Sequence, residues 1–213
     1  MLIRHSLLLA SLVGLGLLSA CTTTSKGDPR PTDSAENTAA SSTPQTSDNG
    51  EELPFAGAPK VTDPLDTSRY EQDPCQSLTS DQAQSLNLPP TGKINDKVAL
   101  SNACEWFNPD TRGRVMVSFI VDDPRGLSPE YDVKNRGGWE FFEELPNIEG
   151  YPAIARNNPD DRDIGRCTVV VGVADDMAFA IDLKLSQVNI GVKDPCEVAT
   201  DVAGLALQTM KEA

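Results

Sequence analysis

The chain has 213 residues, of which 18 are Lys or Arg and 32 are Asp or Glu, so its formal net charge at pH 7 is −14. A surface this acidic repels nucleic acid, and no basic run with interleaved aromatic residues is present to overcome the repulsion. Nucleic acid is therefore excluded as an expected partner, and a bare anionic membrane surface would repel the chain in the same way.

The N-terminal residues have the pattern of an export signal that ends at a lipoprotein cleavage site. Arg4 precedes an apolar run from Leu7 to Leu18, and Ser19-Ala20 stands directly before Cys21. The run is short for a bilayer span, and small residues before the cleavage point are typical of a removed signal peptide. We expect residues 1–20 to be removed and Cys21 to be lipidated, which would hold the protein on the extracytoplasmic side of the cell membrane.

Residues 21–68 are rich in Ser, Thr, Asp, Pro and Ala, and Leu53 and Phe55 are exceptions among few large apolar side chains. Such a segment buries too little surface to offset the entropy of ordering it. We expect a disordered stalk there. Residues 69–213 have the size of one globular domain.

Four cysteines lie in this domain, at Cys75, Cys104, Cys167 and Cys196. An even number in an exported chain indicates two disulfides, for which three connectivities are possible. The first two and the last two cysteines are each 29 positions apart, and this spacing favours sequential pairing. A zinc site is not favoured, because the chain has no Cys-x-x-Cys pair and its only histidine, His5, leaves with the signal peptide.

Helix starts are marked by a repeated tripeptide. Asp-Pro-Cys occurs at residues 73–75 and again at 194–196, where Asp suits a helix N-cap and Pro suits the first helical position. After the first copy, Thr79 and Gln82 have the spacing of a capping box. After the second, one apolar stripe continues to the C-terminus and predicts a long helix that packs on a sheet.

Alternating apolar residues predict two β-hairpins, one from Leu100–Phe107 with Arg114–Val121 and one from Cys167–Val173 with Met177–Leu185. Between them we expect a helix over Ser128–Leu145, interrupted by two glycines at 137 and 138, and a short strand over Tyr151–Ala155. The order α-β-β-α-β-β-β-α predicts an α+β fold, an antiparallel sheet with helices packed on it and two disulfides.

Several of these features resemble the actinobacterial lipoproteins of the domain of unknown function 3558 family. The shared features are the lipoprotein cleavage site, the low-complexity stalk, and the residues around the cysteines, which are Asp73-Pro74-Cys75, Cys104-Glu105-Trp106, Arg166-Cys167 and Asp194-Pro195-Cys196-Glu197. The resemblance implies an envelope lipoprotein with two disulfides. It implies no activity, so no catalytic residue is carried over.

Catalytic machinery is sparse in the sequence. Loss of His5 excludes Ser-His-Asp and Cys-His sites from the mature chain, and no glycine-rich phosphate motif is present, so we expect no cofactor. Adjacent carboxylates occur at 122–123, 143–144, 160–161 with Asp163, and 175–176. Asp160, Asp161 and Asp163 are the best candidates for a cation, but Arg162 and Arg166 are close enough in sequence to neutralise them, and we expect a solvated loop instead.

Trp139, Phe141 and Phe142 crowd three aromatic side chains into four residues. On a helix they cannot all face the same way, so at least one is expected to be available to a ligand or partner, although core packing is the simpler interpretation. Trp106 follows Cys104 by two positions, so both point to the same side of the strand, and we expect it to pack on the disulfide.

Two functions from different classes remain open. The first is a non-catalytic binding module that holds an envelope protein, a wall component or a small ligand outside the membrane. The second is a hydrolase that uses two carboxylates. A structural spacer is a further alternative.

Overall fold

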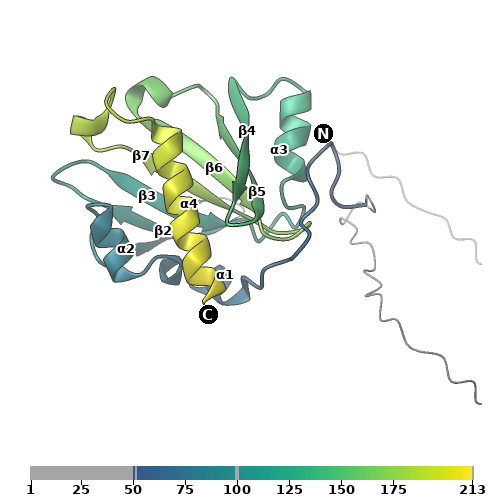
Figure 1. The fold of residues 1–213 in the computed structure, drawn as a ribbon, viewed down its shortest axis with the longest axis horizontal. Helices are drawn as coiled ribbons and strands as arrows, with labels where there is room; N and C mark the ends of the chain where they lie inside the picture. The colour runs from purple at the N-terminus through teal and green to yellow at the C-terminus, as the bar shows by residue number, and fades with distance from the viewer. Residues whose placement is uncertain (1–49, 51, 99–100, 213) are drawn as a thin grey trace, which may run out of the picture. The chain divides into compact units, whose positions relative to one another are not determined.

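The computed structural model describes residue 50, residues 52–98 and residues 101–212. The predicted signal peptide and Cys21 lie outside the described residues. Seven antiparallel strands form one sheet in the order β1-β2-β3-β7-β6-β5-β4, and α4 crosses one side of it (Figure 1). None of the described helices is long and apolar enough to cross a membrane.

The strands are β1 (Lys93–Asn95), β2 (Asn102–Phe107), β3 (Arg114–Phe119), β4 (Phe141–Ile148), β5 (Tyr151–Asn157), β6 (Arg166–Gly172) and β7 (Ala178–Lys184). The α-helices are α1 (Ser68–Gln72), α2 (Ser80–Ser85), α3 (Ser128–Asn135) and α4 (Pro195–Lys211). Three short 3₁₀ helices are η1 (Pro74–Ser77), η2 (Arg162–Ile164) and η3 (Gln187–Asn189). The α+β class and the antiparallel sheet with helices on it are thus confirmed.

The main hydrophobic core lies between α4 and the sheet, on what we call the α4 face. Successive strand residues point to opposite sides, so every second residue of the central strands faces α4. Val117, Phe119 and Ile181 are among these core residues, and the helix contributes Val202 and Leu207. The predicted apolar stripe is therefore the surface by which the C-terminal helix is held.

The opposite side of the sheet, which we call the α3 face, is covered by α3 over only part of its width. Leu127 and Tyr131 pack there against Ile154, Val170 and Ala180. Burial, followed by the charge of Glu144, raises the pKa of Tyr131 to about 12. At the other end of β3, β7 and β6, the α3 face carries Arg114, Lys184 and Arg166.

Both disulfides have the predicted sequential pairing. Cys75 bonds to Cys104, and Cys167 bonds to Cys196, each across 29 positions. Each bond joins the start of a helical turn to a strand. The second is held at its helix end by Asp194, whose carboxylate accepts hydrogen bonds from the backbone N–H groups of Cys196 at 2.7 Å and Glu197 at 3.2 Å.

The predicted helix over Ser128–Leu145 is wrong in its second half. The helix ends at Asn135, and Gly137 takes a left-handed φ of 71°, which terminates it. Phe141 then begins β4, an edge strand. Aromatic residues fit a strand that pairs with β5, and this pairing overrides the weak helical pattern that continues past the glycines.

The predicted boundary of the stalk at residue 68 is too late. Leu53 and Val61 are only 4% and 5% exposed, and both pack within the domain. The N–H of Val61 donates to the carboxylate of Asp175 at 2.8 Å, and the N–H of Leu65 donates to the carbonyl of Val173 at 2.9 Å. Spaced apolar residues and backbone hydrogen bonds thus order residues 52–68 despite their polar composition.

The predicted strand boundaries agree with the structure to within about two residues for both hairpins, and the strand expected at Tyr151–Ala155 extends to Asn157. β1 was not expected. It has three residues, and its pairing with β2 through Ile94 and Cys104 is what identifies it. A strand this short has too few residues for alternation to be visible in sequence.

Candidate functional site

The three aromatic residues that were candidates for partner contact do not form one free surface. Phe141 and Phe142 are consecutive on β4, so they point to opposite faces, and both are half-buried. A cation covers each ring: the guanidinium of Arg162 lies 3.6 Å from the ring centre of Phe141, and the ammonium of Lys134 lies 4.7 Å from that of Phe142. These two rings therefore serve packing within the fold.

Trp139 is held from two sides. Its indole N–H donates to the carbonyl of Glu130 at 3.1 Å, and the guanidinium of Arg156 lies 4.5 Å from the ring centre. Arg156 in turn donates to both oxygens of the Glu130 carboxylate at 3.0 and 3.1 Å. Trp139 nevertheless lines a surface depression described below, so its role as a ligand contact stays a prediction.

The candidate cation loop is neutralised by arginines. Arg162 donates to both oxygens of Asp160, at 2.8 and 2.7 Å, and this hydrogen bonding lowers the pKa of the Asp160 carboxyl. Arg166 lies 3.7 Å from the Asp161 carboxylate, and Asp163 is exposed. Within the described part of the chain, no group of three or more His, Cys, Asp or Glu side chains is placed to hold a metal ion.

In each of the other adjacent carboxylate pairs, one member is engaged in a structural contact. Asp123 pairs with Arg125, and Glu144 pairs with Lys134 at 2.7 Å. Asp175 accepts the hydrogen bond from the N–H of Val61 noted above. None of these contacts sets two carboxylates across a shared cleft, which acid and base catalysis of glycoside hydrolysis needs.

The most unusual arrangement of charge lies on the α3 face, where three cations form a row across three neighbouring strands. Arg114 of β3 is the register partner of Lys184 of β7, and Lys184 is the register partner of Arg166 of β6. Like charges directly opposite one another destabilise an antiparallel pair. This chain has two such pairs side by side although its net charge is −14.

The row forms one side of a cavity of about 290 Å³, which we call the basic hollow. Its lining consists of Glu105, Phe107, Arg112, Arg114, Arg166 and Lys184. Phe107 is the register partner of Arg114 on β2, so it extends the row with an aromatic ring that is 43% exposed. The turn between β2 and β3 supplies Arg112, which has a left-handed φ of 62°.

The carboxylates near the row are too distant to neutralise it fully. Arg114 lies 3.4 Å from Glu105, and Arg166 lies 3.7 Å from Asp161, whereas strong charge-assisted hydrogen bonds are about 2.7 to 2.9 Å long. Among the described residues, Lys184 has no ion pair within 4.0 Å. The buried Nε of Arg114 also has no hydrogen-bond acceptor in the described part of the chain. An unsatisfied buried donor of this kind lowers the stability of the fold by about 1 to 3 kcal/mol.

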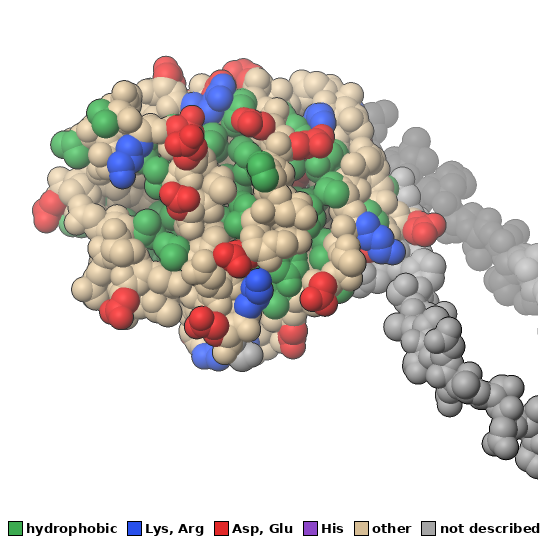
Figure 2. Space-filling view, in the orientation of Figure 1, with side chains coloured by type: hydrophobic (Ala, Val, Ile, Leu, Met, Phe, Trp, Pro, Cys, Tyr) green, Lys and Arg blue, Asp and Glu red, His purple; other side chains and the backbone are tan. Residues whose placement is uncertain are grey.

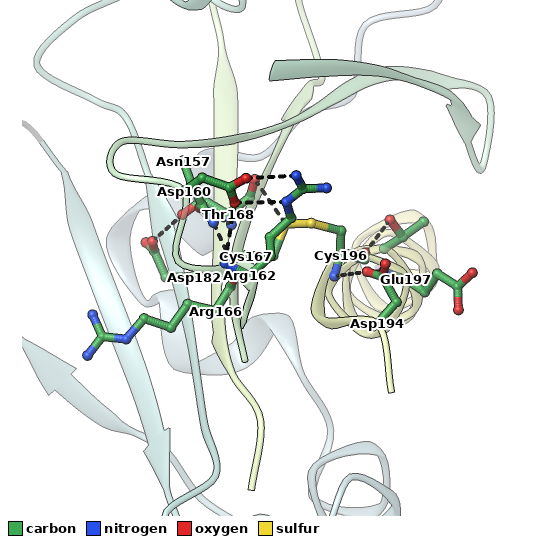
Figure 3. The surroundings of a disulfide bond; sticks show 11 residues. Asn157, Asp160, Arg162, Arg166, Cys167, Thr168, Asp182, Asp194, Cys196 and Glu197 are labelled. Atoms are coloured by element: carbon green, nitrogen blue, oxygen red, sulfur yellow. Dashed lines mark hydrogen bonds and ion pairs between the residues drawn. A yellow bond between two sulfur atoms is a disulfide. The ribbon is translucent and has the colours of Figure 1, made fainter. Parts of the chain in front are cut away.

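A second depression of about 230 Å³ adjoins the basic hollow and shares Arg114 and Arg166 with it. Trp139, Arg156 and Asp182 lie along its wall. Figure 3 shows Arg166 extending away from the Cys167–Cys196 disulfide, because consecutive residues of β6 point to opposite faces. The disulfide thus fixes the strand on the α4 face while Arg166 remains available on the other.

Two further cavities differ in character. One of about 210 Å³ lies among α2, α4 and the ends of β3 and β7, and much of its wall is core side chains such as Leu88 and Val202. Another of about 630 Å³ is an open groove between α4 and the turn after β4. On the α4 side, acidic and basic side chains are scattered among apolar ones (Figure 2). The first cavity also includes Arg114, Lys184 and Lys193 in a mainly apolar and uncharged lining, and the second includes two carboxylates and no Lys or Arg.

Arg114, Lys184 and Arg166 were not predicted as site residues from the sequence. The sequence contained a signal for them, because each lies near the end of an expected strand. In the alternating pattern of that strand, each occupies a position that faces away from the core residues. Within the second hairpin, the pairing of Arg166 with Lys184 follows from the turn. The pairing of β3 with β7 joins residues 70 positions apart and has no local signal.

A family model described as "Protein of unknown function (DUF3558)" matches residues 16–209. The chain belongs to the DUF3558 family. The match covers the whole described fold apart from the last turn of α4, and it confirms the resemblance found in the sequence. No curated protein and no solved structure matches the chain. Membership in DUF3558 assigns no activity, so a functional argument must start from the basic hollow.

Proposed function

We propose that this protein is an extracytoplasmic lipoprotein, anchored through Cys21, whose domain binds a ligand without transforming it. The observation that carries the proposal is the in-register row of Arg114, Lys184 and Arg166 around the basic hollow. An arrangement that opposes folding is typical of functional sites, where stability is given up for recognition.

The chemistry of the hollow favours binding over catalysis. Its lining is four cations, one carboxylate and one phenyl ring, with no hydroxyl, thiol or imidazole side chain that could act as a nucleophile or base. Three of the adjacent carboxylates that a hydrolase could use, Asp123, Glu144 and Asp160, are held in ion pairs elsewhere in the fold. Two disulfides and a continuous sheet support a preorganised recognition surface, which lowers the entropic cost of binding.

Anchoring is tested by replacing the cysteine of the cleavage site. In cells expressing Cys21→Ala, we expect the protein to be released into the medium or to remain uncleaved, because no acyl chain is attached. Membrane fractionation together with intact-mass measurement distinguishes these forms from the wild type. The matched control is Thr22→Ala, which keeps the acylated cysteine and should stay with the membrane. Unchanged membrane retention of a cleaved Cys21→Ala protein would contradict the proposal.

Binding is tested by native mass spectrometry on the full chain taken from its own membrane. We expect a bound small-molecule mass on the wild-type protein and its loss in Lys184→Gln, because the replacement removes the central charge of the row. The spacer alternative would be favoured by two results together. The wild-type protein would carry no bound molecule, and membrane extract would not change its melting temperature.

A further inference from the structure

We propose that the basic hollow binds a dianionic group, of which a phosphate monoester is the simplest, carried on a flat ring that rests against Phe107. This inference rests on the proposed binding function and specifies the chemistry of the ligand. It is carried by three observations about the hollow: its charge, the register of that charge, and the exposed ring beside it.

The charge of the hollow matches a dianion. Four cations and one carboxylate, that of Glu105, line it, and Asp161 and Asp182 lie in the adjoining depression, so positive charge is in excess. A phosphate monoester carries about −1.5 to −2 charges at pH 7 and offers three acceptor oxygens. The planar guanidinium groups of Arg114 and Arg166 can each donate two parallel hydrogen bonds to such oxygens, and Lys184 between them supplies a compact positive charge.

The register places the donors where one group can meet all three. Neighbouring strands are about 4.8 Å apart, so the backbones of Arg114 and Arg166 are separated by about 10 Å with Lys184 midway. Side chains of this length converge over the central strand when an anion is there to attract them. Without an anion, the same side chains repel one another, and their nearest carboxylates lie at 3.4 and 3.7 Å.

Phe107 narrows the ligand class further. Its ring continues the row beyond Arg114 and is 43% exposed, so part of the ring is open to a ligand. A free anion would gain nothing from this ring. A ligand whose anionic group is attached to a flat ring would bury the phenyl face while its charge lies over the cations.

The test measures the melting temperature of the full chain, with and without small probes. We expect phenyl phosphate to raise it most and inorganic phosphate to raise it less, because the second lacks a ring, whereas phenol should leave it unchanged. Lys184→Gln should weaken phenyl phosphate binding about tenfold or more, since a hydrogen bond to a charged group is lost. Arg166→Gln serves as the second variant and should weaken binding similarly.

Two comparisons separate a built site from general attraction to positive charge. Lys60 is an exposed lysine next to Val61, and the hydrogen bond of Val61 with Asp175 places this segment at the other end of the sheet. Lys60→Gln should therefore not change the rise in melting temperature caused by phenyl phosphate. Phe107→Ala should weaken the binding of phenyl phosphate about threefold to tenfold and leave the binding of inorganic phosphate unchanged.

The like-charge pairs of the row predict a further effect in the absence of ligand. Lys184→Gln should then melt about 1 to 4 °C higher than the wild type, since two like-charge pairs are relieved.

The proposal is overturned if phenyl phosphate does not stabilise the wild type, or if it stabilises Lys184→Gln and Arg166→Gln as much as the wild type. Competition by vesicles of phosphatidic acid in phosphatidylcholine would assign the dianion to a lipid headgroup, and phenyl phosphate binding without such competition would assign it to a soluble ligand. Phosphorus NMR of phenyl phosphate after incubation with the protein separates the proposed non-catalytic function from the proposed ligand class. Released inorganic phosphate would contradict non-catalytic binding but would still support the ligand class. A bound native ligand without phosphate or carboxylate retains the binding function but refutes the ligand class.

Discussion

Gly92 shows how much one residue can decide in this fold. A Cβ atom at this position would lie 2.3 Å from the Sγ of Cys104 and 2.7 Å from the indole of Trp106. The absence of a side chain thus lets the tryptophan and the Cys75–Cys104 disulfide share one buried space, as expected from their positions two apart on β2. Neither neighbour can move freely, because Trp106 is 1% exposed and Cys104 is fully buried.

Replacing two glycines by alanine should have opposite effects. Gly92→Ala is expected to lower the free energy of unfolding by about 1 to 3 kcal/mol, because it overpacks a rigid region. Gly204→Ala lies within α4, where the new Cβ would make an ordinary contact at 3.8 Å with Ile148, and it should stabilise by about 0.5 to 1 kcal/mol. Denaturant unfolding under non-reducing conditions measures both, and a loss of stability at Gly204 would contradict the second expectation.

Two copies of the same tripeptide begin very different elements. Asp73-Pro74-Cys75 opens η1, a 3₁₀ helix of 4 residues, whereas Asp194-Pro195-Cys196 opens α4, which has 17 residues. The cap chemistry is the same, since each aspartate accepts a hydrogen bond from the N–H of its cysteine. The difference lies downstream, because only α4 continues with an apolar stripe that the sheet can bury.

The cap of the long helix should contribute measurably to stability. We expect Asp194→Ala to lower the free energy of unfolding by about 1 kcal/mol, because two backbone N–H groups lose their acceptor near the N-terminal end of the helix dipole. Asp201→Ala is the matched control: Asp201 is an exposed aspartate in the middle of α4, and its replacement should cause no loss. Chemical denaturation measures both, and equal losses would show that the cap has no special role.

At the scale of the whole molecule, the folded region extends further toward the N-terminus than composition indicates. Residues 52–68 run along the domain and contact both the hairpin between β6 and β7 and the start of α3. Each contact is a backbone group paired with a distant residue, for example the N–H of Phe55 with the hydroxyl of Ser128 at 3.0 Å. The predicted stalk between the lipid anchor and the domain therefore has to end before Leu53.

Single substitutions in the full chain test this extension. Leu53→Ala and Val61→Ala are each expected to lower the free energy of unfolding by about 1 to 3 kcal/mol, because they remove buried apolar side chains. Val188→Ala is the matched control, since Val188 is 79% exposed and its loss should leave thermal unfolding unchanged. Wild-type melting of both N-terminal variants would mean that the segment is a stalk after all.

Features whose cause is local could be predicted from the order of residues alone. Helix starts at Thr79 and Asp194 follow from capping chemistry, and the two hairpins follow from alternation around short turns. The equal separation of the cysteines predicted the correct pairing, because each disulfide joins the start of a helix to a strand that packs against it. The resemblance to the DUF3558 family was also read from local residues, and the match to the family model over residues 16–209 confirms the family.

Contacts between residues far apart in the chain depend on how the whole sheet packs, and they could not be predicted locally. Phe141 lies in a strand because β5 was available to pair with it, although the preceding pattern indicated helix. Arg114 lies beside Lys184 because β3 pairs with β7, and a shift of this register by one residue would place the arginine on the other face. The hairpin turn predicts the pair of Arg166 and Lys184, but long-range register depends on the packing of the whole sheet, so the addition of Arg114 to this row has no signature in any single segment.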